Sequence, residues 1–255
     1  MTVTLQGLSA GPLASLLKLR RASNTGYLFL GANELAILLA KRFARAGITV
    51  ELVDTSSEHA AAAEAAGLKV IYGNGLDPRT LAKARVDTRS HVVAATASES
   101  VNMLFAQKLA DDLQEPPRLL VAIDPSSTGV APAMVHKVGG TVLFGRGVEL
   151  DAWLVRMRHK GVELVRKMYV GPEGPRDPLP EQVLPLYRER EGVPRLIDDH
   201  TELRDGDLVE LLLAVEAREA IDAWFATQPW QDVVEARHEP VLVKPGSTAE
   251  TPKAA

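Results

Sequence analysis

Hydrophobic positions in the first half of the chain follow two alternating patterns, short apolar runs and longer stretches with helical spacing. The apolar runs are hydrophobic at nearly every position, and they occur at residues 26–31, 48–53, 68–72, 90–95, 118–123 and 141–144. Between them, apolar residues recur at helical spacing, or alanine dominates, at 34–46, 56–66, 78–84, 98–113 and 127–138. Strands that are apolar on both faces are typical of a parallel sheet covered by helices. The pattern therefore predicts an α/β fold, with a doubly wound parallel sheet over residues 26–145.

The pattern changes after the sixth predicted strand. A crossover helix is predicted over 146–161, and a second, small α+β module is predicted over 162–228. The module has four predicted strands and a closing helix, at 162–170, 182–188, 193–197, 207–214 and 216–226. Its Asp205-Gly206 pair is typical of a tight hairpin turn. Residues 1–25 are expected to be a linker, and residues 229–255, which end in PGSTAETPKAA, a largely disordered tail.

Composition narrows the functional classes. A net charge of −4, with no block of lysine and arginine interleaved with aromatic residues, argues against a nucleic-acid partner. The chain has no cysteine, which excludes disulfides, thiolate metal sites and cysteine nucleophiles. No apolar run reaches 18 residues, and the N-terminus lacks the order of a signal peptide. We therefore expect a soluble, cytoplasmic protein.

The turn after the first predicted strand, GANELA, is a degenerate form of the phosphate-binding pattern G-x-G-x-x-G. Gly31 is expected to let the chain turn sharply, so that a phosphate can sit on the N-terminus of the next helix. Asn33 replaces the second glycine, and its side-chain amide could hydrogen-bond a phosphate or a ribose. Asp54 follows Gly31 by 23 residues, where an acid accepts hydrogen bonds from ribose hydroxyls and repels a 2′-phosphate. Alternatively, Gly31 only makes a turn and Asp54 caps the helix from residue 56.

Two more polar stretches follow predicted strands, GNGLDP at 73–78 and AATASES at 94–100. Both belong to the carboxyl ends of strands beside the switch point, where ligands of such sheets bind. The succession GANELA, VDT, YGNGLDPRTL and AATASESVNMLFAQKLA resembles the nucleotide-binding domain of the regulator-of-potassium-conductance (RCK) family, also called TrkA-N. Members of that family occur on bacterial potassium channels, transporters and cation:proton antiporters. The resemblance covers about residues 26–145 and implies a Rossmann-like fold.

Carried over position by position, the resemblance implies a set of ligand contacts at the carboxyl ends of the strands. They are Gly31, Asn33, Glu34 and Leu35 at the phosphate turn, Asp54 and Thr55 at the ribose, Gly73, Asn74 and Gly75 near the adenine, and Thr96 and Ser98 after the fourth strand. The family often has an acid at position 74 and an arginine late in the fifth strand that meets phosphate. This chain has Asn74 and the apolar run 121–123 instead. NAD or NADH, an adenine mononucleotide such as AMP or ATP, and no ligand at all therefore remain open.

The rest of the chain extends the resemblance. Residues 162–214 resemble a diverged form of the family's small C-terminal module, TrkA-C, and residues 1–20 are similar to the end of the membrane domain of monovalent cation:proton antiporters. The resemblance implies a homodimeric regulatory module, at the cytoplasmic face of the membrane, that controls K⁺ or Na⁺ exchange for protons by an antiporter or channel. Trp153, Leu154 and Met157 on the crossover helix, and the helix at 98–110, are candidates for the dimer interface. Packing on the chain's own sheet is the alternative.

Two other functional classes stay open, an NAD-dependent oxidoreductase and a scaffold that binds no nucleotide. The sequence lacks the Tyr-x-x-x-Lys spacing of short-chain reductases. GLSAG at 7–11 matches G-x-S-x-G, but too few residues precede it to supply the sheet that a hydrolase nucleophile needs. The six histidines form no metal-binding motif, and the acidic stretch 198–207 lacks EF-hand spacing. We therefore assign no catalytic residue and no metal ligand, and expect a regulatory protein rather than an enzyme.

Overall fold

The computed structural model describes residues 25–124, 126, 129–172 and 178–233. Six parallel strands form its first sheet, in the order β3-β2-β1-β4-β5-β6. They are β1 (Tyr27–Leu30), β2 (Val50–Asp54), β3 (Lys69–Tyr72), β4 (His91–Ala94), β5 (Arg118–Val121) and β6 (Gly140–Val142). The chain builds outward from β1 to β3 and then returns to place β4 on the other side of β1. This confirms the doubly wound, Rossmann-like sheet and puts the switch point between β1 and β4.

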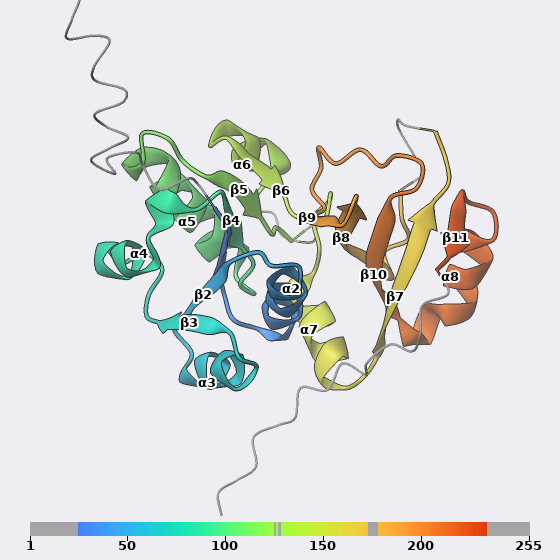
Figure 1. Ribbon diagram of the computed structural model, residues 1–255, viewed down its shortest axis with the longest axis horizontal. Helices are drawn as coiled ribbons and strands as arrows, with labels where there is room; N and C mark the ends of the chain where they lie inside the picture. The colour runs from blue at the N-terminus through green and yellow to red at the C-terminus, as the bar shows by residue number, and fades with distance from the viewer. Residues whose placement is uncertain (1–24, 125, 127–128, 173–177, 234–255) are drawn as a thin grey trace, which may run out of the picture.

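Helices cover both faces of this sheet (Figure 1). They are α2 (Glu34–Arg45), α3 (Ser57–Ala65), α4 (Pro78–Ala84), α5 (Glu99–Asp112) and α6 (Pro132–Lys137), with a 3-10 turn at Val86–Thr88. Tyr27 and Phe29 belong to the core that includes α2, whereas Leu28 and Leu30 belong to the core that includes α4, α5 and α6. Because successive strand residues point to opposite faces, a strand buried on both faces reads as a continuous apolar run.

Side-chain caps explain where most of these helices begin. Asn33, Ser56, Asp77 and Ser98 each accept a hydrogen bond from a backbone N–H in the first turn of α2, α3, α4 and α5. These polar residues satisfy donors that have no partner inside the helix, so the helix starts immediately after them. The helix predicted at 127–138 begins later, at Pro132, whose fixed backbone angle suits the first helical position.

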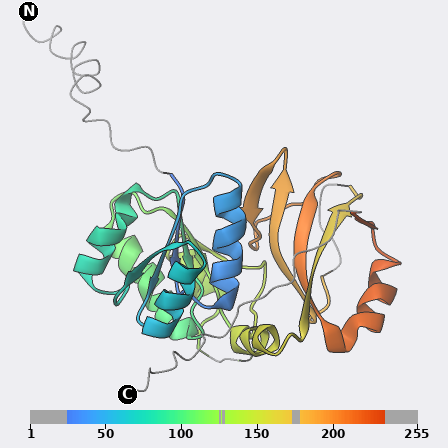
Figure 2. The same ribbon diagram turned by 60° about the horizontal axis from the view of Figure 1, so that its bottom comes forward.

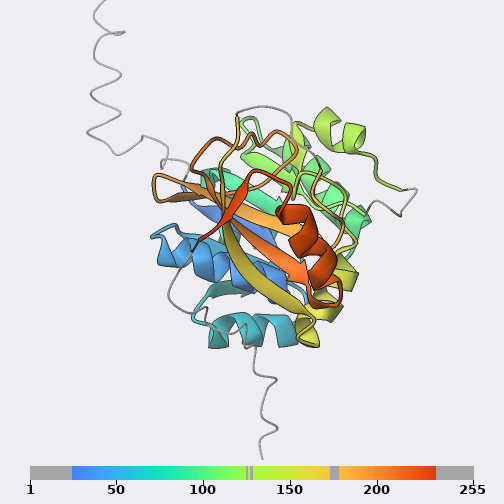
Figure 3. The same ribbon diagram turned by 90° about the vertical axis from the view of Figure 1, so that its right-hand side faces the viewer.

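A second sheet of five antiparallel strands follows, in the order β11-β7-β10-β8-β9. Its elements are α7 (Leu150–Arg158), β7 (Val162–Tyr169), β8 (Val183–Arg190), β9 (Val193–Leu196), β10 (Leu208–Ala214), a 3-10 turn (Val215–Ala217), α8 (Arg218–Phe225) and β11 (Trp230–Asp232). Helix α8 lies on the outer face of the sheet (Figure 3), where Ile221 and Phe225 join a core with Val209 and Leu211. This confirms a second α+β module.

Two details of this module differ from the predictions made from the sequence. The tight hairpin joins β8 to β9 through Glu191 and Gly192, both with positive φ, whereas the Asp205-Gly206 turn leads into β10, which does not pair with β9. Residues 230–232, placed in the predicted tail, form the edge strand β11, because Trp230 packs on Tyr169 and Phe225. Residues 1–24, which contain nearly all of the predicted linker and the GLSAG stretch, lie outside the described residues, as do 234–255.

The two sheets share one hydrophobic core. Helix α2 stands between them (Figure 2), and the core around it contains Phe43 from α2 together with Leu184 and Leu212 from the second sheet. Trp153, Leu154 and Met157 are buried in this same core at 4–6% exposure. The interpretation of that face as a dimer interface is therefore wrong, because the chain's own α2 and second sheet already bury it.

Backbone hydrogen bonds also join the modules. Residues 197–199 run antiparallel to the end of β6, where the Phe144 N–H donates to the Ile197 carbonyl at 2.7 Å and the Asp199 N–H to the Val142 carbonyl at 3.1 Å. Behind them, the buried Asp198 carboxylate accepts from Arg118 at 2.5 Å and from the Thr141 hydroxyl at 2.9 Å. The second module thus pairs directly with the edge of the first sheet.

Candidate nucleotide site

The turn between β1 and α2 has the geometry of a phosphate-binding turn. Gly31 has φ of 101°, and a Cβ there would lie 3.1 Å from the Ala95 carbonyl oxygen. A side chain would therefore be strained and crowded, which explains the glycine. Glu34 and Leu35 are the first two residues of α2, so their N–H groups have no acceptor inside the helix and sit at its positive end. The turn expected at Gly31 is present, with donors suited to an anion.

Asn33 does something different from what its position in the motif indicates. Its Oδ1 accepts from the Ala36 N–H at 2.9 Å, and its Nδ2 donates to the Ala95 carbonyl at 2.7 Å. The residue is 5% exposed and has φ of −68°, which any residue adopts. Its side chain caps α2 and ties the turn to the end of β4. Because each end of the amide already has a partner within the protein, the structure shows a structural role for Asn33 and does not test its contact with phosphate or ribose.

Asp54, at the end of β2, is held against the same turn. Its Oδ2 accepts from the Ala32 N–H at 2.6 Å and lies 3.0 Å from His59 Nδ1, and its Oδ1 accepts from the Ser56 N–H at 2.8 Å. The N-cap of α3 is Ser56, so Asp54 supports that helix start without capping it. A carboxylate offers about four acceptor positions, and three are used here. Asp54 therefore keeps room to accept from about one further hydroxyl, and Thr55 beside it is exposed.

The loop after β3 packs against the same edge. The Gly73 N–H donates to the Asp54 carbonyl at 2.8 Å. A Cβ on Gly75 would lie 2.3 Å from Leu30 Cδ1, so a side chain there would require the Leu30 side chain to move. Asn74 is exposed, and its Oδ1 accepts from the Leu76 N–H at 2.9 Å, which shapes the turn. The loop is thus brought beside the Gly31 turn, as expected.

The end of β4 completes the edge through a network centred on Asn102. Thr96 donates its hydroxyl to Asn102 Oδ1 at 2.7 Å, and Ser98 caps α5. Asn102 Nδ2 donates to the carbonyls of Thr96 and Ala122, both at 3.0 Å, so it links the ends of β4 and β5. This asparagine is 1% exposed. No sequence pattern predicted its role, because a polar residue within a helix has no local signal of such distant contacts.

Two further side chains at the site, His59 and Arg158, were not predicted from the sequence. His59, in the first turn of α3, contacts Asp54 as described above. Arg158, from the end of α7, lies 3.3 Å from the Glu34 carboxylate at the phosphate turn. The end of β5, where the resembling family often has an arginine, is buried and apolar over residues 121–123. A cation at this turn therefore comes from the crossover helix, which no pattern in the first domain could indicate.

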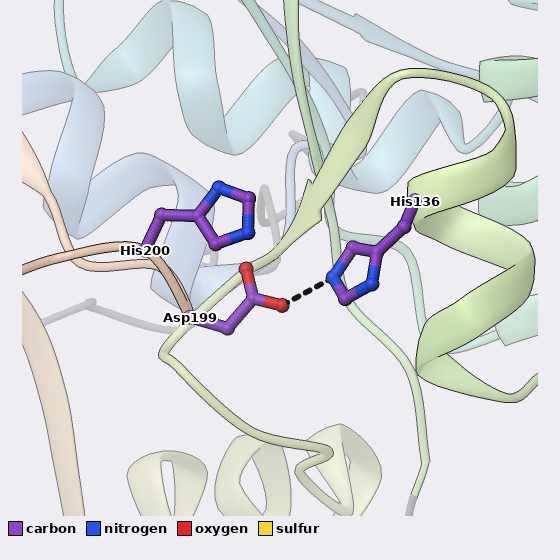
Figure 4. Close-up of side chains that lie close together, drawn as sticks. All are labelled: His136, Asp199 and His200. Carbon is purple, nitrogen blue, oxygen red and sulfur yellow. Dashed lines mark hydrogen bonds and ion pairs between the residues drawn. The ribbon is translucent and has the colours of Figure 1, made fainter.

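A separate cluster lies between the modules, formed by His136, Asp199 and His200 (Figure 4). Their ligand atoms lie within 4.8 Å of one another, which brings together histidines that are scattered in the sequence. His136 Nε2 lies 2.5 Å from Asp199 Oδ2, and the two imidazole rings stack at 5.6 Å. Imidazole nitrogens and a carboxylate are donors that zinc takes. Because a direct contact already joins two of the three side chains, His136 and Asp199, we assign no metal to the cluster.

Comparison with known proteins identifies the first domain. The TrkA-N domain model matches residues 27–143, from the start of β1 to just past β6. The TrkA-N domain of inner membrane protein YbaL from Escherichia coli is similar over 54% of this chain and 96% of that chain, with 11% identity and a TM-score of 0.43. The GsuK channel bound to NAD is similar over 80% of this chain and 39% of that one, with 14% identity and a TM-score of 0.40. No curated protein sequence is significantly similar.

Within the described residues, no helix combines the length and the apolar character that crossing a membrane requires.

The family match covers the sheet whose carboxyl edge holds the Gly31 turn and Asp54. The four sequence motifs occur along it in the order expected of the family. Residues 27–143 of this chain are therefore a TrkA-N domain.

Proposed function

We propose that the chain is a regulatory module that binds an adenine nucleotide at the Gly31 turn and thereby controls monovalent cation transport by a membrane antiporter or channel. One observation carries the proposal. The region that matches the TrkA-N model contains a turn between β1 and α2 that has phosphate-binding geometry without a ligand. Gly31 lies in the turn that leads into the N-terminus of α2, and the Asp54 carboxylate is held 2.6 Å from the Ala32 N–H of the same turn. A turn built in advance lowers the cost of ordering the site when ligand binds.

The charges at the turn favour a nucleotide without a 2′-phosphate. The Asp54 carboxylate would accept from a ribose hydroxyl and repel a phosphate at that position. The phosphates would lie on the N–H groups of Glu34 and Leu35, with Arg158 as a nearby cation. NAD, NADH, AMP and ATP all satisfy these requirements. Asn33 and Asn102 would hold the strand ends in place and would not touch the ligand through their side chains.

Helix α2 offers a physical route from the ligand to the second module. Its N-terminus forms the phosphate turn, and in its last turn Arg42 Nε lies 3.0 Å from the buried carboxylate of Glu210 on β10. A ligand that favoured one position of α2 would therefore favour one arrangement of the two modules. Regulation then follows from the difference in ligand affinity between the two arrangements.

The partner would be a membrane cation transporter, fused to this chain or separate from it, with the module on the cytoplasmic side. A homodimer is part of the proposal, and the α7 face is excluded from its interface because it is buried. On α5, Val101 and Leu104 are 38% and 55% exposed, so this helix remains the candidate for the dimer contact. An open reading frame for a cation transporter fused to or beside this chain in its genome would support the partner.

Calorimetric titration of the purified chain with NAD, NADH, AMP and ATP tests the ligand. We expect at least one of them to bind, with an affinity that drops in Asp54→Ala and is unchanged in Asp222→Ala, an exposed residue on α8. Absence of binding by all four would favour a scaffold without a nucleotide. Oxidation of NADH on addition of carbonyl substrates would instead favour the oxidoreductase alternative and contradict the regulatory proposal.

A further inference from the structure

A second cavity lies at the opposite edge of the first sheet from the Gly31 turn. Its volume is about 210 Å³, and Tyr27, His91 and Arg118, the first residues of β1, β4 and β5, form one side. The other side comes from the second module, with residues of β8, β9 and the loop at 200–204. All strands of the first sheet are parallel, so their first residues lie at the edge away from the nucleotide site. The cavity is therefore distinct from the candidate site described above.

Arginine dominates the lining of this cavity. Five arginines line it, Arg118, Arg188, Arg190, Arg195 and Arg204, against one acidic residue, Glu202. Two of the arginines are paired with buried acids just outside the lining, since Arg118 lies 2.5 Å from Asp198 and Arg190 contacts both oxygens of Asp207 at 2.7 Å. Among the residues that line the cavity, arginines therefore outnumber acidic residues. The chain as a whole has a net charge of −4, so this local excess is opposite in sign to the overall charge.

The excess of positive charge is clearest at Arg188 and Arg195. They are register partners on β8 and β9, directly opposite each other, and both point into the cavity. Like charges directly opposite on neighbouring strands destabilise a sheet. Among the described residues, neither guanidinium has a hydrogen bond or an ion pair. Burial, with Arg190 and Arg195 nearby, lowers the pKa of Arg188, although Asp207 opposes the shift.

The floor of the cavity, formed by Tyr27 and His91, is neutral. The rings of Tyr27 and His91 stack with centroids 4.4 Å apart and planes within 9°. Burial raises the pKa of Tyr27 to about 12, and burial together with Arg118 and Arg195 lowers the pKa of His91 to about 4. At neutral pH neither ring carries a charge. The floor therefore adds no negative group that could offset the arginines.

We propose that this cavity is a binding site for a compact polyanion, a di- or trianion with phosphate or carboxylate groups, which bridges the two modules. Arginine presents a planar fork of donors that matches both groups in two-point contacts. The volume is below the range of about 300–1,000 Å³ that is usual for drug-sized ligands, which argues for a small anion such as pyrophosphate rather than a dinucleotide. The anion would neutralise the facing pair of Arg188 and Arg195 and draw Arg118 from the first sheet toward them.

Calorimetry with pyrophosphate and with citrate, at constant ionic strength, tests the site in the full chain. The variants are Arg188→Gln and Arg195→Gln, with Arg79→Gln on the exposed surface of α4 as the matched control. Each cavity variant should weaken binding by about tenfold or more, and the control should leave it unchanged. Tighter binding of pyrophosphate assigns a phosphate ligand, and tighter binding of citrate assigns a carboxylate ligand.

Thermal unfolding without ligand shows whether Arg195 contributes to the stability of the fold or to anion binding. Because Arg195→Gln removes one of two facing like charges, its melting temperature without anion should equal or exceed that of the wild type, while the rise on adding anion is lost. Nucleotide binding in Arg195→Gln should stay at the wild-type level, since the Gly31 turn lies at the other edge. Equal loss of anion binding in Arg79→Gln, or no binding of either anion at millimolar concentration, would overturn the proposal.

Discussion

The Asp54 carboxylate accepts a hydrogen bond of 2.6 Å from the backbone N–H of Ala32, which joins the end of β2 to the turn that follows β1. The acid that would bind a ribose is therefore fixed by the same turn that would bind the phosphates. A contact of this kind organises the site before ligand arrives, but it also uses part of the acceptor capacity of Asp54. The two effects can be separated by mutation.

Asp54→Ala should weaken nucleotide binding, whereas His59→Ala should not. Loss of the carboxylate removes the ribose acceptor and should raise the Kd by about tenfold or more. Loss of the imidazole frees Oδ2, which His59 Nδ1 approaches at 3.0 Å, and should leave the Kd unchanged or lower it by about two- to threefold. Titration of both variants with the same nucleotide by calorimetry checks this. Equal weakening in both would mean that His59 itself contacts the ligand.

Asn33→Gly should cost stability without a matching loss of affinity. The glycine restores the phosphate-binding pattern, but it removes the cap on Ala36 and leaves the buried Ala95 carbonyl without its amide donor. We expect the free energy of unfolding in urea to fall by about 1–2 kcal/mol. The matched control, Ser56→Gly, removes one cap bond at α3 and should cost only a few tenths of a kcal/mol. A large loss of nucleotide binding in Asn33→Gly would restore the Asn33 side chain as a ligand contact.

Glu210→Ala should destabilise the chain strongly. This carboxylate is 3% exposed, and it accepts from the Tyr187 hydroxyl and pairs with Arg42 at 3.0 Å. Burial and Glu210 together raise the pKa of Tyr187. Removing the acid leaves buried donors unpaired, for which about 3–5 kcal/mol is typical. Asp222→Ala, which breaks an exposed pair with Arg218 on α8, should cost under about 1 kcal/mol in the same urea experiment. Similar values for the two variants would contradict a buried link between α2 and β10.

His91 should make stability depend on pH between about 4 and 6.5. Its pKa is lowered from 6.5 to about 4, chiefly by burial, so the unfolded chain takes up a proton in this window and the folded chain does not. Stability is therefore complete above pH 6.5 and falls as the pH drops toward 4, by roughly 1–3 kcal/mol for this group. Urea unfolding at pH 7 and at pH 4.8 should show a smaller loss in His91→Gln than in the wild type.

The two buried aspartates with lowered pKa values, Asp198 and Asp207, lose their contributions below this window. Hydrogen bonds outweigh burial and lower the pKa values of Asp198 and Asp207 from 3.8, so their contributions are lost only at lower pH. Identical pH dependence in wild type and His91→Gln would show that the histidine is not held neutral in the folded chain.

The sequence alone determined the first sheet and the position of its ligand edge. Continuous apolar runs indicated strands buried on both faces, which holds for β1 and nearly all of β2 but not for the edge strand β3. Gly31 ends the first of these runs, and Asp54 directly follows the second. Because parallel strands end at one edge of a sheet, these residues had to meet there, and the structure brings them within one hydrogen bond of each other through Ala32. The local pattern is sufficient to predict strands and their ends, because the spacing of apolar residues can be read from neighbouring positions.

Only the tertiary structure decided what the polar side chains do. Asn33 turns to Ala95, which follows it by 62 residues, and Arg42 of α2 meets Glu210 of the second sheet. The facing of Arg188 and Arg195 depends on a hairpin at residues 191–192 that the turn signals did not identify. These contacts join residues distant in sequence, and they form because burial makes an unpaired polar group costly. No local pattern records which distant partner satisfies a given donor or acceptor.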